Sequence, residues 1–184
     1  MVRLLFIFQF FIFFNSAISA QIETISTKDT TRYSEKQAME EEKFIAATAF
    51  RLANKTKEAI PLLQELIKNN KTEPTFYYEL ARTYYLDKQY DDALTNASKS
   101  VSLDPANLYY AIFEAEILEK QGNAEMAASK YETIISKHPR VEEYWLKMAK
   151  LYNAAAMPVK SIETFERMGN TFGFSEEILF RKFR

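Results

Sequence analysis

The imidazole and thiol side chains that many metal centres and covalent catalysts use are almost absent from this 184-residue chain. His138 is the only histidine, and there is no cysteine. One imidazole cannot form a metal-binding cluster, and the lack of thiols excludes disulfides, thiol catalysis and thiolate-held zinc or iron–sulfur sites. His138 precedes Pro139 at the end of an expected helix, where an imidazole interacts favourably with the helix dipole. We therefore expect no metal and no cofactor.

Paired carboxylates are the remaining candidates for general acid–base chemistry. Glu40 with Glu42 and Glu142 with Glu143 form such pairs. Both pairs fall near the starts of expected helices, where negative charge is favoured in any case. The sequence contains neither a Gly-x-Ser-x-Gly elbow nor a Gly-x-x-x-x-Gly-Lys phosphate loop. We expect that the protein is not an enzyme, and a site built on an unrecognised carboxylate is the formal alternative.

The composition favours a helical protein that does not bind nucleic acid. Only 3 glycines and 5 prolines are present, whereas 47% of the residues are hydrophobic and 15% are aromatic. So few turn-forming residues cannot supply the many tight turns of a β-sandwich or β-barrel. The formal net charge of −1 offers no basic surface for a phosphate backbone.

The first twenty residues have the order of a secretory signal peptide. Arg3 is followed by an apolar stretch from Leu4 to Phe14, which only Gln9 interrupts, and then by small residues up to Ala20. This stretch is shorter than the roughly 18–20 residues that span a membrane. We expect cleavage after residues 1–20, export to a periplasm or cell envelope, and no membrane insertion after cleavage. A retained anchor is the alternative. Residues 21–34 are polar and are expected to form a disordered leader.

Small and large residues recur every 34 positions in the rest of the chain, and such periods organise whole folds. Two columns of small residues hold Ala47, Ala81, Ala115 and Ala149, and Ala59, Ala93, Ala127 and Ser161. Two columns of mostly larger residues hold Phe50, Tyr84, Leu118 and Tyr152, and Leu63, Ala97, Tyr131 and Phe165. Members of neighbouring columns lie three or four residues apart, which is the spacing of one helix face. A polar break between the columns divides each copy into helix, turn and helix.

The pattern predicts helices over residues 35–53, 57–69, 74–87, 90–103, 108–121, 124–137, 142–155 and 158–171. Ser34 and Gln37 form a capping box at the start of the first helix. Pro158 suits a helix start, whereas Pro61 should bend or delay the first turn of its helix. We expect Tyr84 and Tyr152 in the core.

In these features the chain resembles the tetratricopeptide-repeat family. The fourth copy carries Trp145, Met148-Ala149, Tyr152, Ser161 and Phe165 in the family's order, and Pro105 and Pro139 close the second and third copies. Alanine replaces the family's small-column glycine, and Gly173 stands where the fourth copy would carry a proline. The resemblance implies an all-α right-handed superhelical solenoid at residues 35–175, with about four repeats at 40–73, 74–107, 108–141 and 142–175.

The resemblance also implies a concave protein-binding groove that the first helix of each repeat lines. Its expected lining residues are Phe44, Thr48, Arg51, Tyr78, Arg82, Tyr85, Tyr109, Ile112, Glu116, Leu146 and Lys150. This mixture suits an extended peptide or a partner helix with apolar anchors and some charge. Alternatively, Tyr78 and Ile112 merely cover the neighbouring core. Family members that bind chaperone tails repeat an asparagine on this face, and no asparagine occurs in the column from Thr48 to Lys150.

We therefore expect an exported scaffold that mediates protein–protein interaction and does not catalyse, with an unidentified protein or peptide as its partner. Residues 176–184 form either a cap helix or the opening turns of a truncated fifth repeat, and the second alternative implies self-association through this end. On that alternative the chain is the N-terminal part of a longer exported repeat protein with little independent function.

Overall fold

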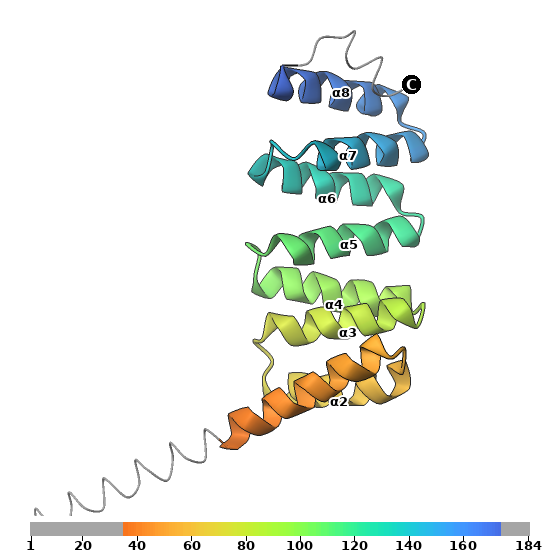
Figure 1. The fold of residues 1–184 in the computed structure, drawn as a ribbon. Coiled ribbons are helices and arrows are strands. Elements are labelled where there is room, and N and C mark those ends of the chain that lie inside the picture. Colours follow the sequence, from red (N-terminus) through yellow and green to blue (C-terminus); the bar gives the residue numbers. More distant parts are fainter. Residues whose placement is uncertain (1–34, 174–184) are drawn as a thin grey trace, which may run out of the picture. The chain divides into compact units, whose positions relative to one another are not determined.

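The computed structural model describes residues 35–173, and the regular structure within this range is entirely α-helical (Figure 1). Residues 35–52 form the first helix. The helices that follow are α2 (Thr56–Asn69), α3 (Pro74–Leu86), α4 (Tyr90–Leu103), α5 (Leu108–Lys120), α6 (Ala124–Lys137), α7 (Glu142–Ala154) and α8 (Pro158–Phe172). Each predicted helix is confirmed, and the bounds differ from the prediction by at most one residue, apart from the start of the first helix, which falls at the edge of the described range.

Several expectations concern residues outside the described range. The signal peptide at 1–20, the leader at 21–34, Ser34 of the capping box and the tail at 176–184 all lie outside it. No helix among residues 35–173 is both long enough and apolar enough to cross a membrane.

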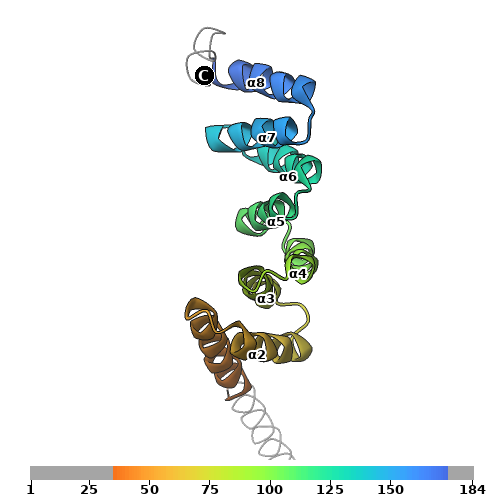
Figure 2. The same cartoon turned by 90° about the vertical axis from the view of Figure 1, so that its right-hand side faces the viewer.

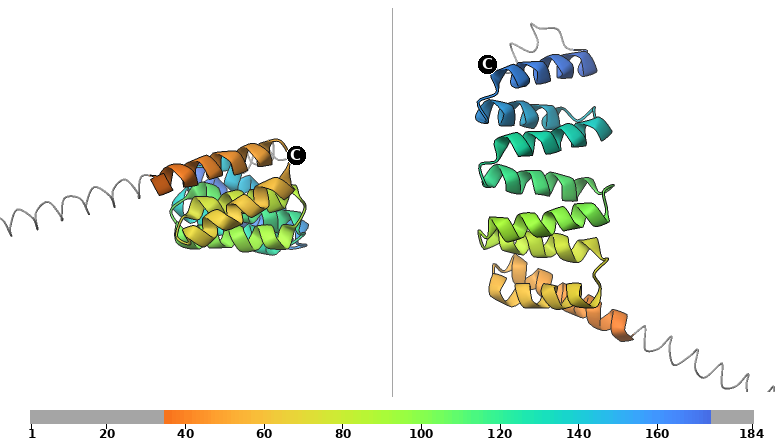
Figure 3. Two further views of the ribbon diagram at one scale, coloured as in Figure 1. Left: turned by 90° about the horizontal axis from the view of Figure 1, so that it is seen from below. Right: turned by 180° about the vertical axis from the view of Figure 1, so that it is seen from behind.

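The chain divides into two compact units, Met1–Ile45 and Ala46–Arg184. In the first unit the described residues are helical, and Lys36 Nζ lies 3.8 Å from Glu40 Oε1. In the second unit each helix from α2 to α8 packs against the next helix in sequence. In Figure 2, α3 and α5 lie on one side of this stack and α4 and α6 on the other, and Figure 3 shows the stacked helices from behind. The second unit is therefore a row of helix pairs.

Side chains about one repeat apart in sequence join neighbouring helix pairs. Thr56 Oγ1 donates a hydrogen bond to Asp87 Oδ1 at 3.0 Å. Arg167 binds Glu132 with both guanidinium NH groups, at 3.1 Å and 2.6 Å, across 35 residues of sequence. A step of one repeat along the chain thus corresponds to a step to the adjacent pair in space, as in solenoids generally.

Both columns of small residues are buried, as their spacing predicts. Their exposed fractions are 0–1% for the alanines and 8% for Ser161. The Ser161 hydroxyl donates to the Ala149 carbonyl oxygen at 3.0 Å, which satisfies the one polar side chain in these columns. Because only methyl-sized groups stand between the helices of a pair, the two backbones can approach closely.

The column of larger residues corrects one expectation. Leu118 and Tyr152 are buried, with exposed fractions of 1% and 9%. Tyr84, however, is only half-buried, and its hydroxyl accepts a hydrogen bond from Gln64 Nε2 at 3.1 Å. Tyr85, the next residue, is half-buried too. The prediction that Tyr84 belongs to the core is therefore wrong. A phenolic hydroxyl needs a hydrogen-bond partner, and Tyr84 finds one at the protein surface.

Pro61 does not delay its helix. Helix α2 begins at Thr56 and continues through Pro61 to Asn69. Because proline has no N–H, the carbonyl of Lys57 loses its helical donor at this position. The rest of the helix keeps its place through its buried residues Ala59, Leu63 and Leu66.

The turn within each helix pair contains one residue in the left-handed conformation. Asn54, Lys88, Gly122 and Ala156 have φ angles of 58°, 63°, 81° and 58°, and they are spaced 34 residues apart. After Ala156, the N–H of Met157 donates to the Tyr152 carbonyl at 2.9 Å, which is the hydrogen bond of a Schellman cap. Only the glycine adopts this conformation without crowding of its Cβ atom.

We predict that Ala156→Gly raises the free energy of unfolding by about 0.5–1 kcal/mol, because it removes this crowding. The matched control is Ala155→Gly, since Ala155 has a φ of −79° and gains nothing from glycine. It should lower the free energy of unfolding by a similar amount, because glycine increases the entropy of the unfolded chain. Urea unfolding of both variants measures the difference. Destabilisation by both changes would contradict the left-handed conformation at Ala156.

Candidate functional site

Helices α3, α5 and α7 carry most of the residues predicted to line a groove. We call their shared surface the first-helix face, and it comprises Tyr78, Arg82, Tyr85, Tyr109, Ile112, Glu116, Leu146 and Lys150. Tyr109 is 74% exposed, and Glu116 and Lys150 are exposed as well. The others are half-buried. Phe44 belongs to the first unit and is half-buried, and Thr48 is half-buried in the second unit.

An aromatic cluster occupies the part of this face that α3 and α5 form. Tyr78 lies with its ring centroid 4.8 Å from that of Tyr110 and 5.5 Å from that of Phe113. The ring of Tyr85 lies 5.5 Å from Phe113 and 5.5 Å from Tyr90, in both cases edge to face. Burial raises the pKa of both Tyr78 and Tyr85, so their phenols stay protonated at neutral pH and can donate hydrogen bonds.

The sequence analysis missed three members of the aromatic cluster. Phe113 and Tyr110 are neighbours of Ile112 on α5, and Tyr90 begins α4. They stand outside the columns that the 34-residue period singled out. The available signal was the density of rings in the segments Tyr77-Tyr78 and Tyr109-Tyr110, which the periodicity did not use. Tyr78 and Ile112 do cover neighbouring core, as the alternative interpretation held, since both pack against buried residues or other rings.

Arg51 was predicted to line the groove, where its side chain would be exposed to a partner, but it is buried. It is only 8% exposed, and its Nε lies 2.6 Å from Glu79 Oε2. Arg82 binds the other oxygen of the same carboxylate at 3.0 Å, and its guanidinium lies 5.5 Å from the centroid of the Tyr78 ring. Arg51 therefore stabilises the contact between the first helix and α3, because Glu79 neutralises a guanidinium that is out of water.

The acidic and basic side chains of α5 and α7 meet at the far part of the first-helix face. Lys147 Nζ lies 2.9 Å from Glu119 Oε2. Glu116, one helical turn before Glu119, has its pKa raised mainly by burial, against the opposing effect of the Lys147 charge. A pocket of about 560 Å³ adjoins this ion pair and is lined by Glu119, Gly122, Ala124, Lys147, Lys150, Leu151 and Ala154. This part of the face therefore carries both charges.

Another carboxylate is buried between α4, α5 and α6. Glu114 is 3% exposed, at a position where the neighbouring repeats bury Leu80 and Met148. Ser98 Oγ donates to one of its oxygens at 2.5 Å, and Lys130 Nζ lies 2.7 Å from the other. Because both oxygens have partners from adjacent helices, the simplest role of Glu114 is to join three helices.

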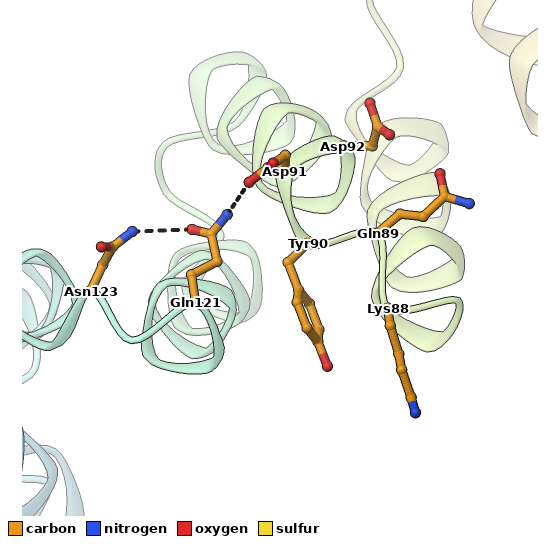
Figure 4. A pocket seen from close by; sticks show the side chains of 7 residues that line it. All are labelled: Lys88, Gln89, Tyr90, Asp91, Asp92, Gln121 and Asn123. Atoms are coloured by element: carbon orange, nitrogen blue, oxygen red, sulfur yellow. Dashed lines mark hydrogen bonds between the residues drawn. The ribbon is translucent and has the colours of Figure 1, made fainter.

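A second pocket, of about 500 Å³, lies where the turns of two adjacent repeats meet (Figure 4). Its residues are Lys88, Gln89, Tyr90, Asp91, Asp92, Gln121 and Asn123. Gln121 Nε2 donates to Asp91 Oδ1 at 2.7 Å, and Gln121 Oε1 accepts from Asn123 Nδ2 at 3.4 Å. Among residues 35–173 no three histidine or carboxylate side chains come together as metal ligands would. Gln121 instead links Asp91 of one repeat to Asn123 of the next and so joins the two turns.

We predict that Glu116→Gln changes the pH dependence of stability. Because folding raises the pKa of this carboxyl, the native state is most favoured at pH values below the ordinary value of about 4.3, and this contribution is lost as the pH rises through the folded value. The variant should therefore be slightly more stable than the native protein at pH 7, and this advantage should disappear near pH 4. Urea midpoints at the two pH values measure it, and a variant less stable at pH 7 would contradict the analysis.

The chain resembles known proteins in its structure, although comparisons of its sequence find no match. No protein-family profile matches the sequence, and no curated protein matches it either. A crystal structure of MamA superposes with a TM-score of 0.63 at 14% identity, over 72% of each chain. The first TPR of Spaghetti (RPAP3), bound to the HSP90 peptide SRMEEVD, superposes with a TM-score of 0.57 at 17% identity, over 64% of this chain and 93% of that one. The Arabidopsis OM64 TPR domain gives 0.55 at 17% identity, over 62% and 94%. The described part of the chain therefore has the tetratricopeptide-repeat fold, an α-solenoid of helix pairs.

Proposed function

We propose that the protein is a scaffold that binds another protein or a peptide through a concave groove on the first-helix face. The observation that carries this proposal is the composition of that face, where exposed Tyr109, Glu116 and Lys150 adjoin a cluster of aromatic rings. Aromatic anchors beside exposed charges are typical of peptide-binding surfaces. The RPAP3 module of the same fold is bound to a peptide, which supports the proposal.

The two pockets favour binding over catalysis. Their residues are polar turn side chains in one case and a lysine–glutamate pair beside small apolar residues in the other. Neither set contains a serine, threonine or cysteine nucleophile beside a base, the arrangement that most covalent catalysis uses. An extended peptide or an amphipathic helix can instead place apolar side chains against the rings and charged ones against the polar part of the face.

We also propose that the protein acts outside the cytoplasm, in a periplasm or cell envelope. The support is the order of residues 1–20, in which a positive charge, an apolar stretch and small residues follow one another. A chain that contains no cysteine folds in an oxidising compartment without mispaired disulfides.

The groove predicts that Tyr109→Ala combined with Lys150→Glu abolishes capture of partner proteins from the envelope fraction of the native cell. Both side chains are exposed, so the variant should keep its helicity and its urea midpoint. The matched control is Lys99→Glu, an exposed position on α4, where capture should be unchanged. If the double variant is well folded and still captures the same proteins, the first-helix face is not the binding surface.

Export predicts a mature chain that begins at Gln21 when the full-length protein is expressed with its natural leader. Intact-mass measurement and amino-terminal sequencing of the protein from the envelope fraction identify the cleavage site. Arg3→Glu should reduce processing, because the positive charge before the apolar stretch orients the signal. Recovery of the uncleaved chain from the cytosol would contradict the localisation.

A further inference from the structure

The first-helix face contains both a carboxylate, that of Glu116, and a row of three aromatic rings. The Phe113 ring lies between Tyr78 and Tyr85, with its centroid 5.5 Å from each. Glu116 follows Phe113 by three residues on α5, a spacing that puts both side chains on one side of a helix. The negative charge of Glu116 acts on the phenols of Tyr78 and Tyr85, since it contributes to the raised pKa of both.

The basic side chains around Glu116 are already engaged with other carboxylates. Lys147 Nζ lies 2.9 Å from Glu119, and Arg82 lies 3.0 Å from Glu79 with its guanidinium near the Tyr78 ring. Within residues 35–173 no cation approaches Glu116 as an ion-pair partner. Glu116 is thus an exposed carboxylate on the same side of α5 as the Phe113 ring, and burial raises its pKa against the opposing charge of Lys147.

We propose that Glu116, with Tyr85 and Phe113, receives an arginine or lysine side chain of the bound peptide. The inference rests on the proposed function and names the chemistry of the partner. A cation over an aromatic ring is attracted by the negative face of that ring. The same cation can donate a charge-assisted hydrogen bond to the carboxylate, which restores the solvation that the rings take away.

The proposed preference is opposite in charge to the acidic peptide SRMEEVD that the RPAP3 module binds. An acidic side chain at this place would meet the negative charge of Glu116, which Lys147 offsets only in part, and like charges brought together in a partly dry site oppose binding. Arg82 shares the single carboxylate of Glu79 with Arg51, so this cluster keeps a net positive charge beside the Tyr78 ring. The preference for a basic side chain therefore applies to the part of the face at Glu116, Tyr85 and Phe113. The site therefore selects between basic and acidic segments, while the rings accept apolar anchors from either.

The test is a library of random 12-residue peptides displayed on phage and selected on the immobilised full chain. We expect the enriched peptides to share one arginine or lysine beside apolar residues. The best of them is synthesised with a fluorescent label, together with a copy in which norleucine replaces that basic residue. Fluorescence anisotropy with the native protein, Glu116→Gln and the control Glu163→Gln gives the dissociation constants. Glu163 is an exposed residue on α8, outside the first-helix face.

We expect Glu116→Gln to weaken binding of the basic peptide about tenfold, as the loss of a hydrogen bond to a charged group does, and to leave the norleucine peptide unaffected. Glu163→Gln should leave both affinities unchanged, and Tyr85→Leu should weaken only the basic peptide. Enriched peptides that are acidic or neutral, with affinities indifferent to Glu116→Gln, would overturn this inference and leave the proposed function standing. If no peptide is enriched over an unrelated helical protein, the proposed function fails and the inference fails with it.

Discussion

Close contact between the two helices of each pair depends on alanines and one serine at eight positions of the chain, where the side chain is no larger than a hydroxymethyl group. These positions are almost completely buried, from Ala47 at one end to Ser161 at the other. Because the backbones meet there, larger residues such as Leu118, Tyr131 and Met148 must lie beside the contact, and they form the core between neighbouring pairs. A larger side chain in place of Ala115 would separate α5 from α6, and overpacking of this kind is costly in a dense interior.

Buried charged side chains fix the alignment of the helices that this apolar contact brings together. Glu79 holds two arginines at the junction of the first helix with α3, and Glu114 joins Ser98 of α4 to Lys130 of α6. Apolar surfaces can slide past one another at small cost, whereas a carboxylate out of water must keep its partners. The two clusters therefore fix how adjacent helices are aligned. The apparent groove residue Arg51 belongs to this alignment, and so it contributes to the fold more than to a binding surface.

The first-helix face is built from residues that serve two purposes. Tyr78 and Tyr85 of α3 pack against other rings and still reach the surface, while Tyr109, Glu116 and Lys150 extend from α5 and α7 into solvent. Solved structures at 14–17% identity share the fold, so the stacking of helix pairs tolerates wide change in sequence. The identity of the exposed residues is therefore free to specify a partner, and in this chain it places one acidic group among aromatic rings.

The sequence alone determined the helices, their bounds and the small buried columns. This was possible because helix pairs obey local rules: the apolar period, the turn residues and the repeat of 34 positions all act within one or two turns of the chain. It could not determine what each groove column would meet across the interface. Glu79 reaches Arg51 from 28 residues away, and Tyr84 keeps its hydroxyl at the surface beside Gln64. Both outcomes depend on which side chains the neighbouring pair presents. Burial and ion pairing between repeats are properties of the assembled stack, and only the tertiary structure decided them.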